Sequence, residues 1–178
     1  MRLIIGIVIA ILFITIFRKA IKSAPLVFYI LAIFLDLLLI MRSTLQLPSW
    51  FSEYFLFLFQ SNTLAMGMFT IVMFTGVFSD RSRIKRVLVS IRSEISIIAS
   101  LLCIGHIVVY GERYLSQLVS PAVAMPEFRF VGTLLALLLA VLLIPLALTS
   151  VKAIRTRMSV SAWKRLQLLA YPFFSRYK

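Results

Sequence analysis

The sequence predicts an all-α fold: a polytopic helical membrane protein with about five transmembrane helices and a truncated or interfacial helix near its C-terminal end. Of the 178 residues, 62% are apolar and only 14% are charged, and the mean hydropathy is +1.04. Soluble domains have about 45–50% apolar and about 25% charged residues, so this chain has more apolar surface than one soluble core can bury. At about 20 residues a span, this length allows six or seven helices at most.

Five apolar runs divide the chain into predicted spans, which form one transmembrane domain over residues 1–178. We expect the spans at about residues 3–17, 24–41, 62–78, 93–111 and 130–150. The aromatic-rich segment 50–60 is typical of an interfacial helix. None of the six glycines falls in a GxGxxG or GxxxxGK[ST] pattern, which argues against a nucleotide-binding domain in this chain.

The basic residues predict the orientation of these spans. The formal net charge is +13, and the cations lie in clusters between apolar runs, which favours a membrane protein and no nucleic-acid partner. Fifteen of the nineteen Lys and Arg residues fall in the first loop, the third loop and the C-terminal tail. The opposite side holds Arg2, Arg42, Arg113 and Arg129. Positive loops favour the cytoplasm, so we expect a multi-pass cell-membrane protein with its N-terminus outside and its C-terminus in the cytoplasm.

The first apolar run permits two interpretations, a signal peptide or a retained helix. It follows Arg2, as the apolar region of a signal peptide would, but Arg18 and Lys19 stand where a small-residue cleavage site is expected. We therefore predict a retained helix.

Asp36 is the only carboxylate well inside an apolar run. A buried acid in lipid is costly, which points either to a proton or cation role or to a side chain that faces the bundle and pairs with a polar neighbour or snorkels outward. Small residues also recur on the fifth span, where Gly132, Ala136 and Ala140 lie four residues apart and would allow close helix contact.

The sole histidine, His106, lies in the fourth predicted span. It follows Arg92 by 14 residues, or about 21 Å along a helix, which places it in the outer half of the membrane. An imidazole there needs a polar partner, a water molecule or a metal centre such as haem iron. The small Ala99 on its helical face and the adjacent Gly105 would leave room for a flat macrocycle. Spacing alone leaves both a packing role and a ligand role open.

Two sequence motifs, found in the same order as in a known family, carry a family resemblance. The first is an arginine at the start of a span followed by an apolar helix ending in GHIVVY at residues 105–110. The second is PLALTS at residues 145–150, then a basic loop and WKRLQLLAY at residues 163–171. Over residues 80–174 the chain resembles the ferric reductase-like transmembrane domain family, which includes the haem-binding membrane subunit of bacterial methionine-sulfoxide reductase.

The resemblance implies a cytochrome b-like electron-transfer subunit of oxidoreductase type. Such a subunit takes electrons from a cytoplasmic donor, such as a flavoprotein, and passes them across the membrane through haem b. His106 matches the family's first ligand position, so the resemblance implies that His106 binds haem iron. It identifies no catalytic side chain and does not specify the electron acceptor.

The second motif departs from the family pattern. Gln167 stands where members with full haem sites often have a histidine, and the chain ends at Lys178 where the family's next helix would follow. With one histidine, three alternatives stay open: a weak or absent second ligand, a symmetric homodimer that pairs two copies of His106, or loss of the haem. The alternative function is a haem-free integral membrane protein that keeps the fold for interaction or assembly.

Two basic segments have roles at the membrane surface. Trp163, Gln167 and Tyr171 recur every four residues, which predicts an amphipathic helix at the cytoplasmic interface. The loop 80–86 has four basic residues in seven, which sets the topology and attracts anionic lipid. A docking role for this loop toward an acidic flavoprotein comes from the resemblance alone.

Overall fold

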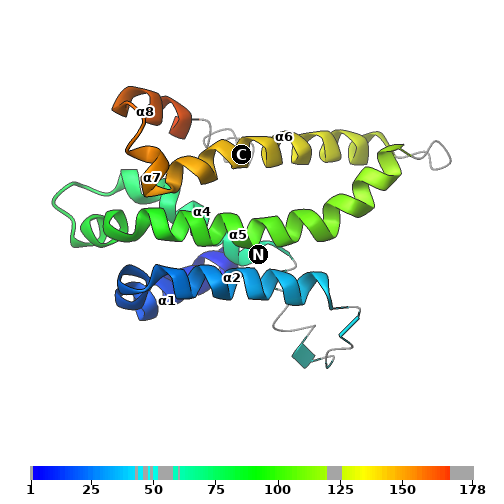
Figure 1. Ribbon diagram of the computed structural model, residues 1–178, viewed down its shortest axis with the longest axis horizontal. Coiled ribbons are helices and arrows are strands. Elements are labelled where there is room, and N and C mark those ends of the chain that lie inside the picture. The colour runs from blue at the N-terminus through cyan, green and yellow to red at the C-terminus, as the bar shows by residue number, and fades with distance from the viewer. Residues whose placement is uncertain are drawn as a thin grey trace. The chain divides into compact units, whose positions relative to one another are not determined.

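The computed structural model describes residues 2–42, 44–45, 48, 50–51, 58–59, 61–119 and 126–168, and its regular elements are all helical (Figure 1). They are α1 (Arg2–Ser23), α2 (Pro25–Ile40), α4 (Thr63–Phe74), the 3₁₀ turn η2 (Thr75–Val77), α5 (Arg83–Val119), α6 (Glu127–Ser150), α7 (Lys152–Arg155) and α8 (Val160–Leu168). The predicted all-α fold is confirmed.

Among the described residues, three helical segments are long and apolar enough to cross a membrane: Leu3–Ser23, Arg83–Gly111 and Glu127–Ser150. Two shorter apolar helices, Pro25–Ile40 and Thr63–Val77, coincide with the other two predicted spans. Most of the predicted interfacial segment 50–60 lies outside the described residues.

The chain forms two compact units that divide within α5, residues 1–106 and residues 107–178. The first unit holds α1, α2, α4, η2 and most of α5. The second holds the end of α5 with α6, α7 and α8. That residues 1–178 form a single transmembrane domain stays a prediction.

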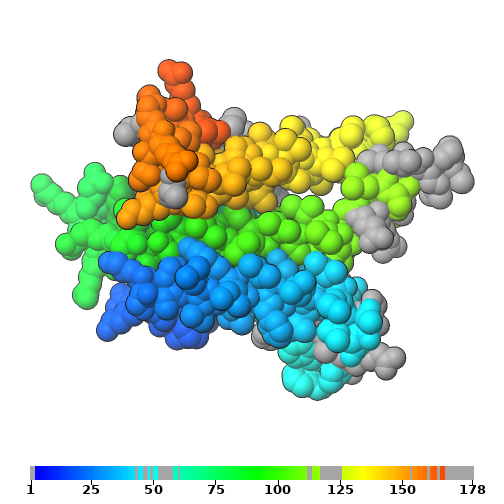
Figure 2. Space-filling view, in the orientation of Figure 1, coloured from blue at the N-terminus to red at the C-terminus, as the bar shows by residue number. Residues whose placement is uncertain are grey.

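A tight hairpin joins α1 to α2. Ala24 alone separates the two helices, and Pro25 occupies the first turn of α2, where its missing N–H costs no hydrogen bond. Phe28 lies edge-on to Phe13 and Phe17, with ring centroids 5.9 Å apart in both pairs. The outer face of α2 is apolar and open, because Leu26 and Ile30 are 69% and 66% exposed. Figure 2 shows the side chains of α1 and α2 packed against each other in the first unit.

Small residues bring α1 and α4 into backbone contact. A Cβ atom built on Gly67 would meet the backbone of Gly6, and one built on Gly6 would meet the carbonyl oxygen of Thr63. Ala10, one turn after Gly6 on the same face, is fully buried. The hydrophobic effect does not drive helices together inside a membrane. Van der Waals packing at small residues is instead one of the main forces that hold them together.

Helix α5 begins at Arg83, ten residues before the predicted span 93–111. Ser82 caps it, because its Oγ accepts the backbone N–H of Ile84 at 3.2 Å and its carbonyl accepts that of Arg86 at 3.2 Å. Ile91, Ile95, Ile98 and Leu102 are at most 3% exposed and recur every three or four residues, so one face of α5 enters the core of the first unit.

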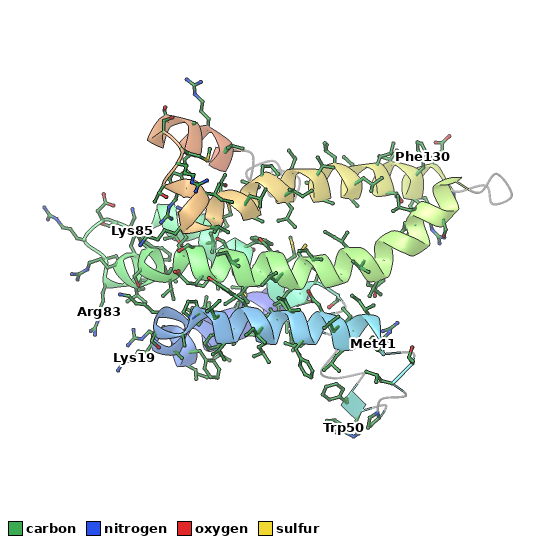
Figure 3. The ribbon with its side chains drawn as sticks, viewed as in Figure 1. Lys19, Met41, Trp50, Arg83, Lys85 and Phe130 are labelled. Atoms are coloured by element: carbon green, nitrogen blue, oxygen red, sulfur yellow. The ribbon has the colours of Figure 1, made fainter. Side chains whose placement is uncertain are left out.

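The two ends of the first unit differ in charge. Figure 3 shows Lys19, Arg83 and Lys85 at one end and Met41 and Trp50 at the other. Lys85 Nζ contacts Asp80 Oδ1 at 2.7 Å, which keeps the pKa of that exposed carboxyl below its usual range. Exposed pairs of this kind add little stability. The first and third predicted loops therefore lie at the same end, as the alternating topology requires.

In the second unit, α6 contains Pro145, whose carbonyl accepts the hydroxyl of Thr149 at 2.8 Å. Helix α8 starts after Ser159, whose Oγ accepts the N–H of Ala162 at 3.3 Å. The helix confirms helical structure for most of the predicted amphipathic segment. Its interfacial position stays a prediction, and Tyr171 lies outside the described residues.

Candidate functional site

His106 lies on α5 and is the last residue of the first unit. The helix runs without interruption from Arg83 to Val119, so the rise from Arg92 to His106 is about 21 Å, as the sequence predicts. The imidazole is half-buried. Because the imidazole is not fully buried, one of its ring nitrogens can still reach a ligand.

The space expected beside His106 is only partly available. Ala99 and Leu102, which share its helical face, are 0% and 3% exposed, so this part of the face is already covered. A Cβ atom on Gly105 would meet the carboxylate of Asp36, so this glycine makes room for Asp36. The expectation that Ala99 and Gly105 leave room for a macrocycle is therefore wrong on this face of α5.

Asp36 brings α2 against α5 at the level of His106. Its side chain is only 8% exposed, and Oδ2 accepts the backbone N–H of Gly105 at 3.3 Å. Its second oxygen, Oδ1, is buried and has no hydrogen-bond partner within the described part of the chain. The interpretation that Asp36 faces the bundle and pairs with a polar neighbour is confirmed.

Asn62 adds a second polar group from the start of α4. It adopts a left-handed conformation with φ of 55°, which asparagine tolerates better than most residues, and it is the N-cap residue of α4. Its Nδ2 donates to Cys103 Sγ at 3.4 Å, while Oδ1 is buried without a partner among the described residues. Asn62 was not predicted from the sequence. The polar triplet at residues 61–63, directly before an apolar run, is the signal that could have found it.

The side chains fit half of a haem site. Haem iron accepts a histidine imidazole as an axial ligand, and His106 is half-buried on a membrane helix. The chain has one histidine, and the described residues hold no group of three His, Cys, Asp or Glu side chains that could bind a metal ion. Gln167 lies on α8, in the other unit, and its side chain is outside the described residues. The second axial position therefore has no histidine from the same chain.

Comparison with known proteins identifies the family. The profile described as "Ferric reductase like transmembrane component" matches residues 61–176, which include α4, α5, α6, α7 and α8. A protein of Treponema pallidum (strain Nichols), named "Uncharacterized protein", is 32% identical over 114 residues, which are 64% of this chain and 31% of the relative. The match thus spans about a third of the relative's own length. No solved structure matches the chain. Because the family profile covers more than half of its residues, the chain belongs to the ferric reductase-like transmembrane component family.

Proposed function

We propose that this chain is a cytochrome b-like electron-transfer subunit, which passes electrons from a cytoplasmic donor across the membrane. Members of its family generally bind haem. The observation that carries the proposal is His106, the one histidine of the chain, half-buried on α5 within the matched residues 61–176. In this proposal His106 binds the iron of haem b, and the bound haem supplies the redox chemistry.

The chain's own part is to hold the site. Helix α5 places His106 about 21 Å from Arg92, away from the charged start of the helix. The contact of Asp36 with Gly105 fixes the neighbouring turn of α5 against α2.

The basic residues near the start of α5 support a docking site for the electron donor. Residues 80–86 hold four cations and one acid, and Asp80 is already paired with Lys85. A basic surface at the start of α5 favours association with an acidic protein, such as a flavoprotein that supplies electrons. Measuring the association of the protein with a candidate donor at increasing salt concentration would test this. Association should weaken, because attraction between exposed charges falls as the Debye length shortens.

Haem binding is tested by spectroscopy of the detergent-purified chain expressed with haem supplied. We expect a Soret band and reduced α and β bands that are lost in His106→Ala. His106→Gly should regain the bands when free imidazole is added, because the small ligand can occupy the vacated position. Cys103→Ser is the matched control, since Cys103 lies one turn earlier on α5 and should leave the spectrum unchanged. Loss of membrane abundance in His106→Ala, with no rescue by imidazole, would indicate a packing role instead.

The second axial ligand is tested by stoichiometry. A homodimer that pairs two copies of His106 would bind one haem for every two chains. A site with a weak or absent second ligand would bind one haem for each chain. The iron content and the mass of the purified complex distinguish the two.

A haem-free assembly subunit is the second candidate function. It is favoured by the filled face of α5 beside Gly105 and by Gln167, which stands where related proteins often have a histidine. This candidate predicts a featureless spectrum and a partner that co-purifies equally with wild type and His106→Ala.

A further inference from the structure

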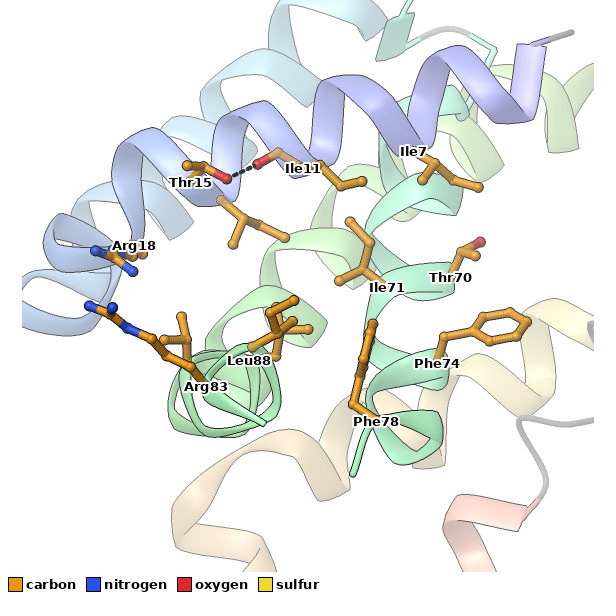
Figure 4. A pocket seen from close by; sticks show the side chains of 13 residues that line it. Ile7, Ile11, Thr15, Arg18, Thr70, Ile71, Phe74, Phe78, Arg83 and Leu88 are labelled. Carbon is orange, nitrogen blue, oxygen red and sulfur yellow. Dashed lines mark hydrogen bonds between the residues drawn. The ribbon is translucent and has the colours of Figure 1, made fainter. Parts of the chain in front are cut away.

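An apolar groove with two arginines at one end lies between α1, α4 and the first turns of α5 (Figure 4). Its volume is about 710 Å³, within the range of about 300–1,000 Å³ that is usual for small-molecule sites. Every residue that lines it belongs to the first unit. His106, Asp36 and Cys103 are not among its lining residues, so the groove is separate from the candidate haem ligand.

The contact between α1 and α4 explains where the groove begins. The two helices touch at Gly6 and Gly67, and the lining starts just beyond that point, at Ile7 on α1 and Thr70 on α4. From there larger side chains such as Ile11 and Phe74 line the groove. The groove is thus a consequence of small residues at one end of the helix pair and large ones further along.

The walls of the groove offer a ligand almost no polar partner. The hydroxyls of Thr15 and Thr70 donate to the carbonyls of Ile11 and Met66 in their own helices, both at 2.7 Å. The other lining side chains, apart from the two arginines, are isoleucine, leucine, valine and phenylalanine. A ligand that fills this space must therefore have an apolar body.

Arg18 and Arg83 supply the polar end. Figure 4 shows the two guanidinium groups on the same side of the groove, facing each other. No acidic residue in the described ranges forms an ion pair with either of them, since Asp80 pairs with Lys85. Two like charges so placed favour an anion between them, and arginine matches the oxygens of a phosphate in geometry and charge.

The length of the groove matches one leaflet of a bilayer. Ile7 and Arg18 are 11 residues apart on α1, or about 16 Å along the helix, and half of a hydrocarbon core of about 30 Å is about 15 Å. With an apolar ligand body along Ile7, Ile11 and Ile71, an anionic head would lie at the level of the phospholipid headgroups.

We propose that this groove binds one anionic phospholipid, with an acyl chain along α1 and α4 and the phosphate held between Arg18 and Arg83. Helix α1 lies outside the family match at residues 61–176, so the site joins an N-terminal helix to the family's own α4 and α5. The proposal does not depend on haem binding.

The test is native mass spectrometry of the full chain in detergent, titrated with phosphatidylglycerol or with phosphatidylcholine of the same acyl chains. Wild type should retain one phosphatidylglycerol with a preference of about tenfold or more, because each cation near the surface adds about 1 kcal/mol. Arg18→Gln with Arg83→Gln should reduce the preference to near parity. Lys19→Gln with Arg81→Gln is the matched control: it removes two charges from the same segments, outside the groove lining, and should keep the preference.

A second variant tests the acyl chain alone. Ile11→Trp adds bulk at a lining position that is 50% exposed, without a change of charge, and should weaken retention by about tenfold. The proposal is overturned if the two lipids are retained equally, if the control pair loses as much as the arginine pair, or if Ile11→Trp binds as wild type does. It is also overturned if sodium phosphate alone displaces phosphatidylglycerol, because the groove would then be a simple anion site.

Discussion

At the scale of single residues, glycines decide how closely the helices approach. Gly67→Ala would place a methyl group against the backbone of Gly6, which cannot move aside as a flexible side chain can. We expect a loss of about 1–3 kcal/mol in the free energy of unfolding, because overpacking outweighs the better helix propensity of alanine. Denaturant unfolding in micelles measures this.

Gly132→Ala is the control for that substitution, since a Cβ built on Gly132 meets no described atom beyond its own helix backbone and chain neighbours within 4 Å. It should be neutral or stabilise by up to about 1 kcal/mol. Equal destabilisation by both variants would show that the crossing of α1 and α4 does not depend on Gly67. Gly132, where the sequence allows close helix contact, has no such neighbour among the described residues, whereas the contact at Gly6 and Gly67 was not predicted.

Asp36 and Gly105 form the second residue-scale contact with a measurable consequence. Gly105→Ala drives a methyl group into the Asp36 carboxylate, so it should destabilise the protein, and Asp36→Ala should relieve most of that cost. A double-mutant cycle should therefore give a coupling of about 1 kcal/mol or more between the two positions. Strict additivity of the two substitutions would mean that α2 and α5 do not meet there.

At the scale of elements, the start of α5 depends on one side chain. Ser82→Ala removes the hydroxyl that accepts the N–H of Ile84, which should cost about 1 kcal/mol and speed amide exchange in the first turn of α5. Ser90→Ala is the matched control, because the Ser90 hydroxyl donates to the carbonyl of Val87 within the helix. Unchanged exchange at residues 83–86 in Ser82→Ala would show that the cap has no role.

The elements show which features a sequence can predict. Five apolar runs and their approximate bounds follow from hydropathy, because a helix that crosses lipid must be apolar along its length. The start of α5 could not be predicted from hydropathy, because residues 83–92 contain four cations, a composition typical of a loop. Contacts such as Asp36 with Gly105 also could not be predicted, because the partners are 69 residues apart.

The candidate site was predicted in part. The sequence and its resemblance single out His106, and the position of that residue on an unbroken helix is confirmed. The surroundings were not foreseen, because Asn62 and Asp36 reach the same level of α5 only through the packing of α4 and α2. A glycine beside a histidine suggested open space, yet the space holds a carboxylate.

At the scale of the whole molecule, the distribution of charge predicts orientation. The chain has one cysteine, so Cys103→Ser gives a cysteine-free background for labelling. On intact cells, an impermeant maleimide should label Thr44→Cys directly and Ser79→Cys only after the cells are made permeable, because basic loops stay in the cytoplasm. The reverse pattern would place the basic loops outside and remove the basis for a cytoplasmic electron donor.

The central claim is that a membrane helix of this chain presents His106 to haem iron. The most direct measurement is a reduced-minus-oxidised absorption spectrum of wild type and His106→Ala, purified at equal membrane abundance. If His106 binds haem iron, wild type should show b-type haem bands and His106→Ala should show none. A featureless wild-type spectrum after haem supply, or bands that persist in His106→Ala, would contradict it.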